Sequence, residues 1–167
     1  MRIRLKWATI ALAAVATLAL VACRNEPPPA ELDAVRAVVD RYVLSINTAD
    51  VALARTVWAD RDDISFIHPL GHELGWDQIK TNFYQKVMGD LFSARTLTIK
   101  KFAIKPYGES AVAEFYWEFN AAFRKDGMAL KTLGRETQVL FKDRTGAWKL
   151  AHVHYSGMPT NIPRDGL

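Results

Sequence analysis

The sequence contains little cysteine and no excess of one charge. Cys23 is the only cysteine among 167 residues, so no intramolecular disulfide can form. The 22 Lys and Arg residues outnumber the 18 Asp and Glu residues, but Arg2, Arg4 and Lys6 lie in the first six positions. Beyond residue 22 the two signs nearly balance and are mixed along the chain. Such a mixed distribution contains no basic stretch of the kind that binds nucleic acid, and we expect no nucleic-acid partner.

Several familiar patterns are also missing from the sequence. It has no internal repeat, no phosphate-binding glycine loop, no serine-nucleophile elbow and no paired-cysteine metal motif. We therefore exclude solenoids and propellers and expect no cofactor. Half of the residues are hydrophobic and 11% are aromatic, which indicates a packed core. The length indicates one domain with short appendages.

The first 23 residues have the pattern of an export signal. Residues 7–22, WATIALAAVATLALVA, carry no charge and follow the basic start. Such a segment is typical of a secretory signal peptide and is short for a transmembrane helix, which needs about 20 residues. It ends Leu20-Val21-Ala22-Cys23, which resembles the lipobox of bacterial lipoproteins. The resemblance implies cleavage before Cys23 and acylation of that residue; the alternative is an uncleaved N-terminal anchor.

The chain after Cys23 begins with a proline-rich stretch that indicates a short extended tether. The predicted segments are a signal peptide (1–22), the lipidated cysteine and tether (23–30), one domain (31–163) and a tail (164–167). Arg24, and not Asp, follows the cysteine, which in Gram-negative lipoproteins favours the outer membrane. We expect an exported protein that is lipid-anchored to the bacterial cell envelope and faces the periplasm if the host is Gram-negative.

Hydrophobic periodicity predicts helices first and strands later. An apolar stripe through Val35, Val39, Tyr42 and Ile46 predicts a helix over 30–48. Further helices are expected from Asp50 to Trp58 and from Trp76, with a short strand hairpin between them. Strands are then predicted over 96–108, 111–123, 134–141 and 147–156. This order favours an α+β fold with helices on one face of a curved antiparallel sheet.

The C-terminal segments resemble a known family. Glu136-Thr137-Gln138-Val139, the Asp143–Trp148 hairpin, the His152 and His154 pair and Ser156-Gly157-Met158-Pro159 follow one another as in SnoaL-like domains of the nuclear transport factor 2-like superfamily. They are especially similar to the association domain of calcium/calmodulin-dependent protein kinase II. Residues 68–85 resemble the same family between its hairpin and its third helix. One departure is Gln138, where the kinase domains have an arginine.

The resemblance implies a cone-shaped fold. A bent sheet and the N-terminal helices enclose a cavity, and the other face of the sheet usually forms a homodimer. Members include ketosteroid isomerases, dehydratases and hydrolases as well as non-catalytic binding domains, so the fold does not settle the function.

The C-terminal strands supply the first candidate site residues. His152 and His154 lie two apart on a strand and share a face with Trp148, which we expect to be the cavity wall. Arg135 and Thr137 are expected on the same wall from the neighbouring strand. A histidine there would serve as a general base and Arg135 would hold an anion. The alternative is that the histidines bond main-chain or tyrosine oxygens and only close the fold.

Other candidates come from earlier segments. His68 is expected near the cavity mouth, and Tyr42 is either a hydroxyl donor or a core residue. A metal site would need His68 as a third ligand beside the histidine pair, and no acidic residue stands at a suitable spacing, so we expect no bound metal. On the strand 111–123, Trp117 and its aromatic neighbours are expected to fill the cone, with Glu114 and Glu118 on the opposite face. The alternative is that these carboxylates point into the cavity and act as acid/base groups with a raised pKa.

Three functions remain open on the sequence. The favoured one is a membrane-tethered module that binds a small apolar or amphipathic ligand, or a partner, in its cone. The second is an isomerase, dehydratase or hydrolase that uses pocket histidines for proton transfer, for which a deep pocket with a histidine–carboxylate contact would argue. The third is an oligomeric assembly hub.

Overall fold

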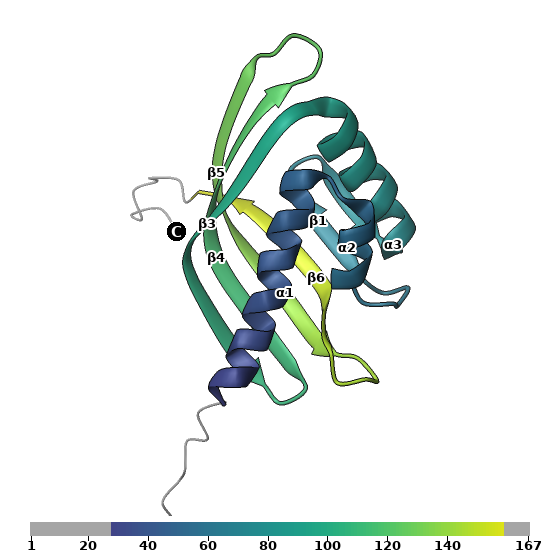
Figure 1. The fold of residues 1–167 in the computed structure, drawn as a ribbon, viewed down its shortest axis with the longest axis vertical. Helices are drawn as coiled ribbons and strands as arrows, with labels where there is room; N and C mark the ends of the chain where they lie inside the picture. Colours follow the sequence, from purple (N-terminus) through teal and green to yellow (C-terminus); the bar gives the residue numbers. More distant parts are fainter. Residues whose placement is uncertain (1–27, 159–167) are drawn as a thin grey trace, which may run out of the picture.

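The computed structural model describes residues 28–158, in which helices cover one face of a six-stranded curved sheet (Figure 1). The helices are α1 (Pro29–Thr48), α2 (Val51–Val57), α3 (Gly75–Gln78) and the π-helical segment η1 (Ile79–Leu91) that continues α3. The strands are β1 (Ser65–His68), β2 (Gly71–Leu74), β3 (Phe92–Tyr107), β4 (Ser110–Phe123), β5 (Ala129–Lys142) and β6 (Trp148–Gly157). The predicted α+β class is confirmed. The predicted signal peptide, Cys23 and the C-terminal tail lie outside the described residues.

The sheet is open and mostly antiparallel. Its strand order is β2-β1-β6-β5-β4-β3, and only the β1–β6 pair is parallel. Figure 1 shows α1 crossing the concave side of the sheet, with α2 and the helix formed by α3 and η1 beside it. The concave face is therefore the one that holds the core.

Local signals in the sequence account for the first two helices. The predicted stripe of α1 is buried at Val35, Val39, Tyr42 and Ile46. Ala49 then takes a left-handed conformation (φ 52°), and Asp50 accepts the Leu53 N–H at 2.9 Å to cap α2. The predicted break between the two helices is confirmed.

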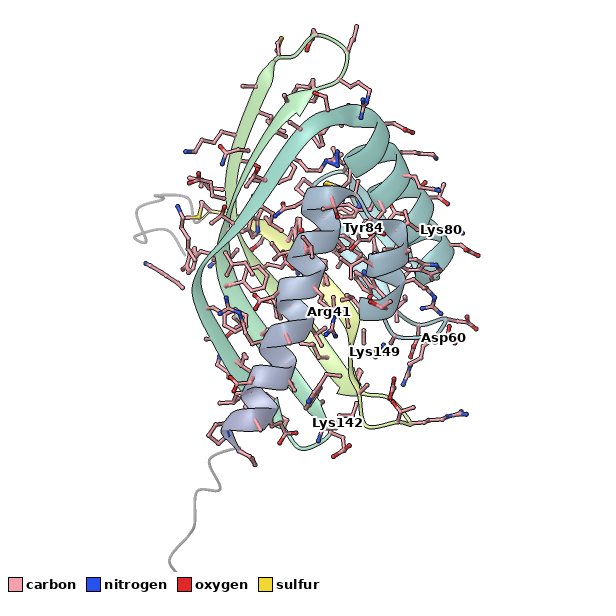
Figure 2. All side chains as sticks on the ribbon, in the orientation of Figure 1. Arg41, Asp60, Lys80, Tyr84, Lys142 and Lys149 are labelled. Atoms are coloured by element: carbon pink, nitrogen blue, oxygen red, sulfur yellow. The ribbon has the colours of Figure 1, made fainter. Side chains whose placement is uncertain are left out.

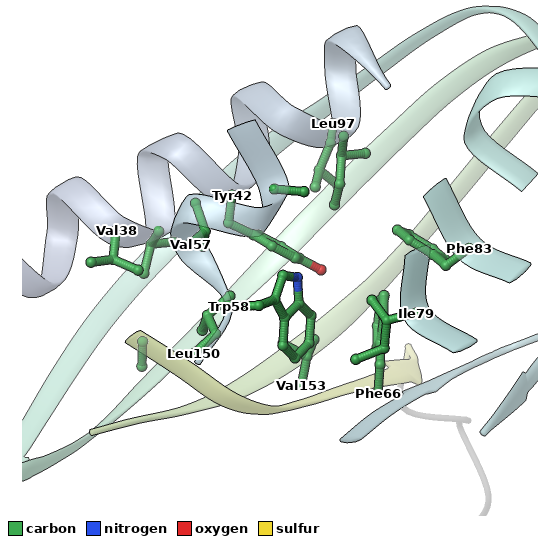
Figure 3. Packing of buried hydrophobic residues seen from close by; sticks show 14 of the residues in the cluster. Val38, Tyr42, Val57, Trp58, Phe66, Ile79, Phe83, Leu97, Leu150 and Val153 are labelled. Atoms are coloured by element: carbon green, nitrogen blue, oxygen red, sulfur yellow. The ribbon is translucent and has the colours of Figure 1, made fainter. Parts of the chain in front are cut away.

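Aromatic side chains form the centre of the core. Figure 3 shows Tyr42 reaching from α1 toward Trp58, with Phe66 and Phe83 beyond the indole. The rings of Phe66 and Phe83 meet edge to face, with centroids 4.4 Å apart. The ring centroids of Trp58 and Phe66 are 5.8 Å apart. A continuous row of rings therefore joins the end of α2 to β1 and η1.

Alternation along β4 sets the two faces of the sheet. Phe115, Trp117 and Phe119 are buried on the concave face, whereas Glu114 and Glu118 lie on the convex face. The predicted orientation of this strand is confirmed. Glu118 pairs there with Lys100 and Lys131, which leaves no carboxylate of β4 in the core.

Gly134 lets Trp117 lie flat over the neighbouring strand. The two residues are cross-strand partners. A Cβ atom on Gly134 would lie 2.4 Å from Trp117 Cζ2 and 2.4 Å from the Ser156 carbonyl oxygen, closer than any real contact. Only glycine therefore fits beneath the indole at this position.

Charges of both signs are spread over the exterior, as the sticks around Asp60, Lys80 and Lys142 illustrate (Figure 2). Lys142 Nζ lies 2.7 Å from Glu31 Oε1, and this ion pair links the start of α1 to the end of β5. Within residues 28–158, no helix is both long enough and apolar enough to cross a bilayer.

Candidate functional site

An apolar cavity of about 250 Å³ lies between the concave face of the sheet, η1 and the β1–β2 hairpin. Its polar lining side chains are His68, Thr132 and Tyr155. The remaining lining residues are Ile46, Pro69, Leu70, Phe83, Val87, Met88, Phe92, Leu97, Trp117, Phe119 and Leu130. Such a lining favours an apolar molecule, and few groups are available to orient it.

His68 is held beside a buried carboxylate at the cavity wall. Its Nδ1 accepts the Leu70 N–H at 3.3 Å, which leaves the ring proton on Nε2. Nε2 faces Glu73 Oε1 at 3.5 Å, and Asn82 donates to Glu73 Oε2 at 2.6 Å. Burial lowers the pKa of His68, and the charge of Glu73 partly opposes this. The wall therefore presents a neutral imidazole aligned by a carboxylate.

Tyr155 connects the cavity to a second buried acid. Its hydroxyl shares a hydrogen bond of 2.7 Å with the Tyr42 hydroxyl, and its cross-strand partner is Glu136. Gln138 Nε2 donates to Glu136 Oε1 at 2.6 Å, while Glu136 Oε2 is buried without a hydrogen-bond partner. Glu136 and Gln138 are both almost fully buried, so this polar cluster lies inside the core.

Burial raises the pKa of Glu136 to about 8, although Gln138, Tyr42 and Tyr155 partly oppose this shift. The acid is therefore mostly protonated at neutral pH. Burial also raises the pKa values of Tyr42 and Tyr155, and the charge that Glu136 acquires when it ionises adds to both shifts. The cluster is thus a set of neutral hydrogen-bonding groups behind the cavity.

The structure brings three predicted residues to this site. His68 and Trp117 line the cavity, and Tyr42 reaches it through Tyr155. Trp148 is buried but does not line the cavity. Glu136 was not predicted as a site residue. The segment 135–139 carries polar residues on both faces, so its pattern does not show that Glu136 is buried. The only signal for Glu136 was its place in the family pattern.

The predicted placement of His152, His154, Arg135 and Thr137 on the cavity wall is wrong. Val139 pairs with His152 and Leu140 with Leu150, so Ala151 forms a bulge in β6. The bulge reverses the alternation that Trp148 and Leu150 begin. Val153 and Tyr155 therefore face the core, and both histidines face the convex side.

The four residues do share one face, as predicted, but it is the convex one. Thr137 pairs with His154, and Arg135 with Ser156. Arg135 and Thr137 line a separate hollow of about 460 Å³ there. His152 Nδ1 lies 2.8 Å from Ser65 Oγ. The structural alternative predicted a main-chain or tyrosine oxygen as the partner of the histidines, whereas the partner of His152 is a serine hydroxyl.

His72, and not His68, lies near the histidine pair. Burial, then the charges of His154 and His72, lower the pKa of His152. Across residues 28–158, no three His, Cys, Asp or Glu side chains are arranged to hold a metal ion.

A curved sheet with helices on its concave face and an apolar cavity between them defines the nuclear transport factor 2-like class of folds. Residues 35–161 match the SnoaL-like domain family, and the chain belongs to that family. No curated protein matches the chain.

Solved structures agree with this assignment. A nuclear transport factor 2-like superfamily protein from Salmonella enterica serovar Typhimurium is 43% identical, with a TM-score of 0.76 over 81% of this chain and 96% of that one. A ketosteroid isomerase-like protein from Erwinia carotovora atroseptica is 21% identical, with a TM-score of 0.66 over 78% and 98%. A protein with a cystatin-like fold from Caulobacter vibrioides is 20% identical, with a TM-score of 0.65 over 78% and 91%. The last two show the fold alone.

Proposed function

We propose that this domain binds a small apolar or amphipathic molecule in the cavity between the sheet and η1. The observation that carries the proposal is the lining, in which apolar side chains surround only three polar ones. The volume of about 250 Å³ is near the lower end of ligand pockets, roughly 300–1,000 Å³, so the ligand is small. Burying its surface away from water supplies the affinity.

The experiment is a calorimetric titration with a neutral apolar probe, 2-naphthalenemethanol. Val87 lines the cavity from η1, and Val87→Trp should fill it and weaken binding at least tenfold. Val112→Trp is the matched control, because Val112 is half-buried on the convex face. No binding to the native protein, or equal binding to both variants, would contradict the proposal.

A second candidate function is proton-transfer catalysis on the bound molecule. The specific observation is the contact between His68 and Glu73 at the cavity wall, which fixes a neutral imidazole with its proton on Nε2. As a general base His68 would accept the proton at Nδ1, in exchange for its long bond from the Leu70 N–H. The likeness to a ketosteroid isomerase-like protein adds an analogy of fold.

His68→Gln separates catalysis from binding. If the domain is an enzyme, this variant should keep the affinity for a bound compound and lose at least a hundredfold in its conversion. A compound that the native protein binds and never converts would leave binding alone as the function.

We further propose that the domain works at the bacterial cell envelope, anchored through an acylated Cys23. The support is the apolar run that ends Leu20-Val21-Ala22-Cys23. From Cys23 to the start of α1 at Pro29 the tether spans at most about 20 Å, at roughly 3.3–3.6 Å per residue. The proposed anchor would therefore hold the cavity close to the membrane surface.

A further inference from the structure

Arg95 places a guanidinium on the concave face beside the cavity. It pairs across β3 and β4 with Ala121, and the next pair on this face is Leu97 with Phe119. Residues opposite each other on antiparallel strands share a face. Phe92, Leu97 and Phe119 line the cavity, so Arg95 lies next to lining residues without being one of them.

Two of the three guanidinium nitrogens of Arg95 lack a hydrogen-bond partner. Nε and Nη1 are buried and unbonded, and Nη2 makes only a long bond of 3.5 Å to the Phe92 carbonyl oxygen. None of the carboxylates in residues 28–158 lies within ion-pair distance of it. Arg95 as a whole is half-buried, but leaving two of its donor nitrogens buried and unbonded is costly, and arginine does not lose its proton to relieve the cost.

The neighbouring charge has the same sign and cannot compensate for the missing anion. Arg124 donates to the carbonyl oxygens of Gly89, Asp90 and Phe92 at 2.8, 3.2 and 3.1 Å, and these bonds fix it at the end of η1. Burial, then the charge of Arg124, lowers the pKa of Arg95. Both guanidinium groups thus donate to the carbonyl oxygen of Phe92, a residue that lines the cavity, and neither makes an ion pair within residues 28–158.

We propose that Arg95 recognises the head of an amphipathic organic anion whose apolar body occupies the cavity. A carboxylate or similar oxyanion accepts charge-assisted N–H bonds from a guanidinium, and the unbonded Nε and Nη1 leave such donors available. A bidentate contact would also use Nη2, whose bond to the Phe92 carbonyl oxygen is long at 3.5 Å. The proposal rests on the proposed function and names the ligand class. His68 and Tyr155 line the same cavity and can contact other parts of the ligand.

The test compares two probes of matched shape, 2-naphthoate and neutral 2-naphthalenemethanol, by calorimetric titration. The native protein should bind the anion at least tenfold more tightly, as expected for a hydrogen-bonded charge. Arg95→Gln should remove this preference and leave the affinity for the neutral probe unchanged. Arg41→Gln is the control, since Arg41 is an exposed cation of α1 (Figure 2) and makes no ion pair with any residue of 28–158.

The outcomes separate the two proposals. Equal affinity of the native protein for both probes, or a preference that survives Arg95→Gln, overturns the role of Arg95 while the cavity proposal stands. Binding of neither probe overturns the cavity proposal and this one with it. If Arg95→Gln does not fold, the native protein is titrated with both probes at low and high salt. The affinity for 2-naphthoate should fall as the salt concentration rises, and the affinity for 2-naphthalenemethanol should not; equal salt dependence would overturn the role of Arg95.

Discussion

At the scale of single residues, the most unusual group is Glu136, a carboxyl buried behind the cavity. Burial raises its pKa from 4.5 to about 8. The folded protein therefore holds a proton that the unfolded chain releases above about pH 4.5. The contribution of this residue to stability is full below that pH and is lost as the pH rises through 8.

Glu136→Gln should remove this pH dependence while keeping a hydrogen-bonding group of the same shape. At pH 9 the variant should be more stable than the native protein, by on the order of 3–5 kcal/mol, because one pKa unit is worth about 1.4 kcal/mol. At pH 4 the two should be nearly equal. Urea unfolding at both pH values checks this.

Glu118→Gln is the control for that experiment. Hydrogen bonds from Asn120, Lys100 and Lys131 lower the pKa of Glu118 to about 2, so its contribution is present above pH 4.5 and is lost as the pH falls toward 2. Its variant should not gain stability at pH 9. A gain there, or an unchanged pH profile in Glu136→Gln, would show that Glu136 is not held neutral.

Gly134 is a second residue whose replacement should lower the stability of the fold. Gly134→Ala should cost about 1–3 kcal/mol of unfolding free energy, because the added Cβ must displace the Trp117 indole or the Ser156 carbonyl. Since Trp117 also lines the cavity, the affinity for 2-naphthalenemethanol should change as well. Gly157→Ala meets no atom within 4 Å and should be nearly neutral in both measurements.

At the scale of elements, the Asn47 side chain links α1 to the main chain of β3. Asn47 accepts the Leu97 N–H at 2.6 Å and donates to the Leu97 carbonyl oxygen at 3.3 Å. Asn47→Ala should cost about 1–3 kcal/mol, because it leaves these main-chain groups without a partner. Thr48→Ala, which removes only an exposed bond to Leu44 within α1, should cost less than about 0.5 kcal/mol. Equal costs in thermal unfolding would argue against this docking role.

The elements also show what the sequence can and cannot predict. The stripe of α1, the Asp50 cap and the alternation of β4 are local patterns, and each is confirmed. The direction of β6 is not local: a single bulged residue, Ala151, reverses which side chains face the core, and no periodicity marks it.

The sequence of the neighbouring strand β5 does not indicate which of its faces is buried. Arg135 and Glu136 are consecutive and both charged, so hydropathy favours neither face. The fold was therefore predictable and the site only partly so. His68, Trp117 and Tyr42 were expected in or near the cavity, whereas Glu136 and Arg95 depend on register and burial.

At the scale of the whole molecule, the proposed acylation of Cys23 would decide where the domain works. Cys23→Ser should release the protein from the membrane fraction, because acylation requires the thiol, and several acyl chains at about 0.8 kcal/mol per CH₂ supply the anchoring. Detergent phase partition of cell extracts measures this. A variant that stays in the membrane would indicate an uncleaved N-terminal anchor instead.

The assembly state is a second property of the whole molecule. The homodimer predicted through the convex face and the larger assembly hub both stay predictions. The mass of the native particle distinguishes them.

If the cavity holds a small apolar or amphipathic molecule, that molecule should be found on the protein itself. The most direct test is native mass spectrometry of residues 24–167, purified from the natural host without the lipid, beside the Val87→Trp variant. We expect a reproducible extra mass on the native protein, with the composition of an organic acid, that is absent from Val87→Trp. A native protein with nothing bound, together with no binding of either naphthalene probe, would contradict the proposal that the cavity binds a ligand.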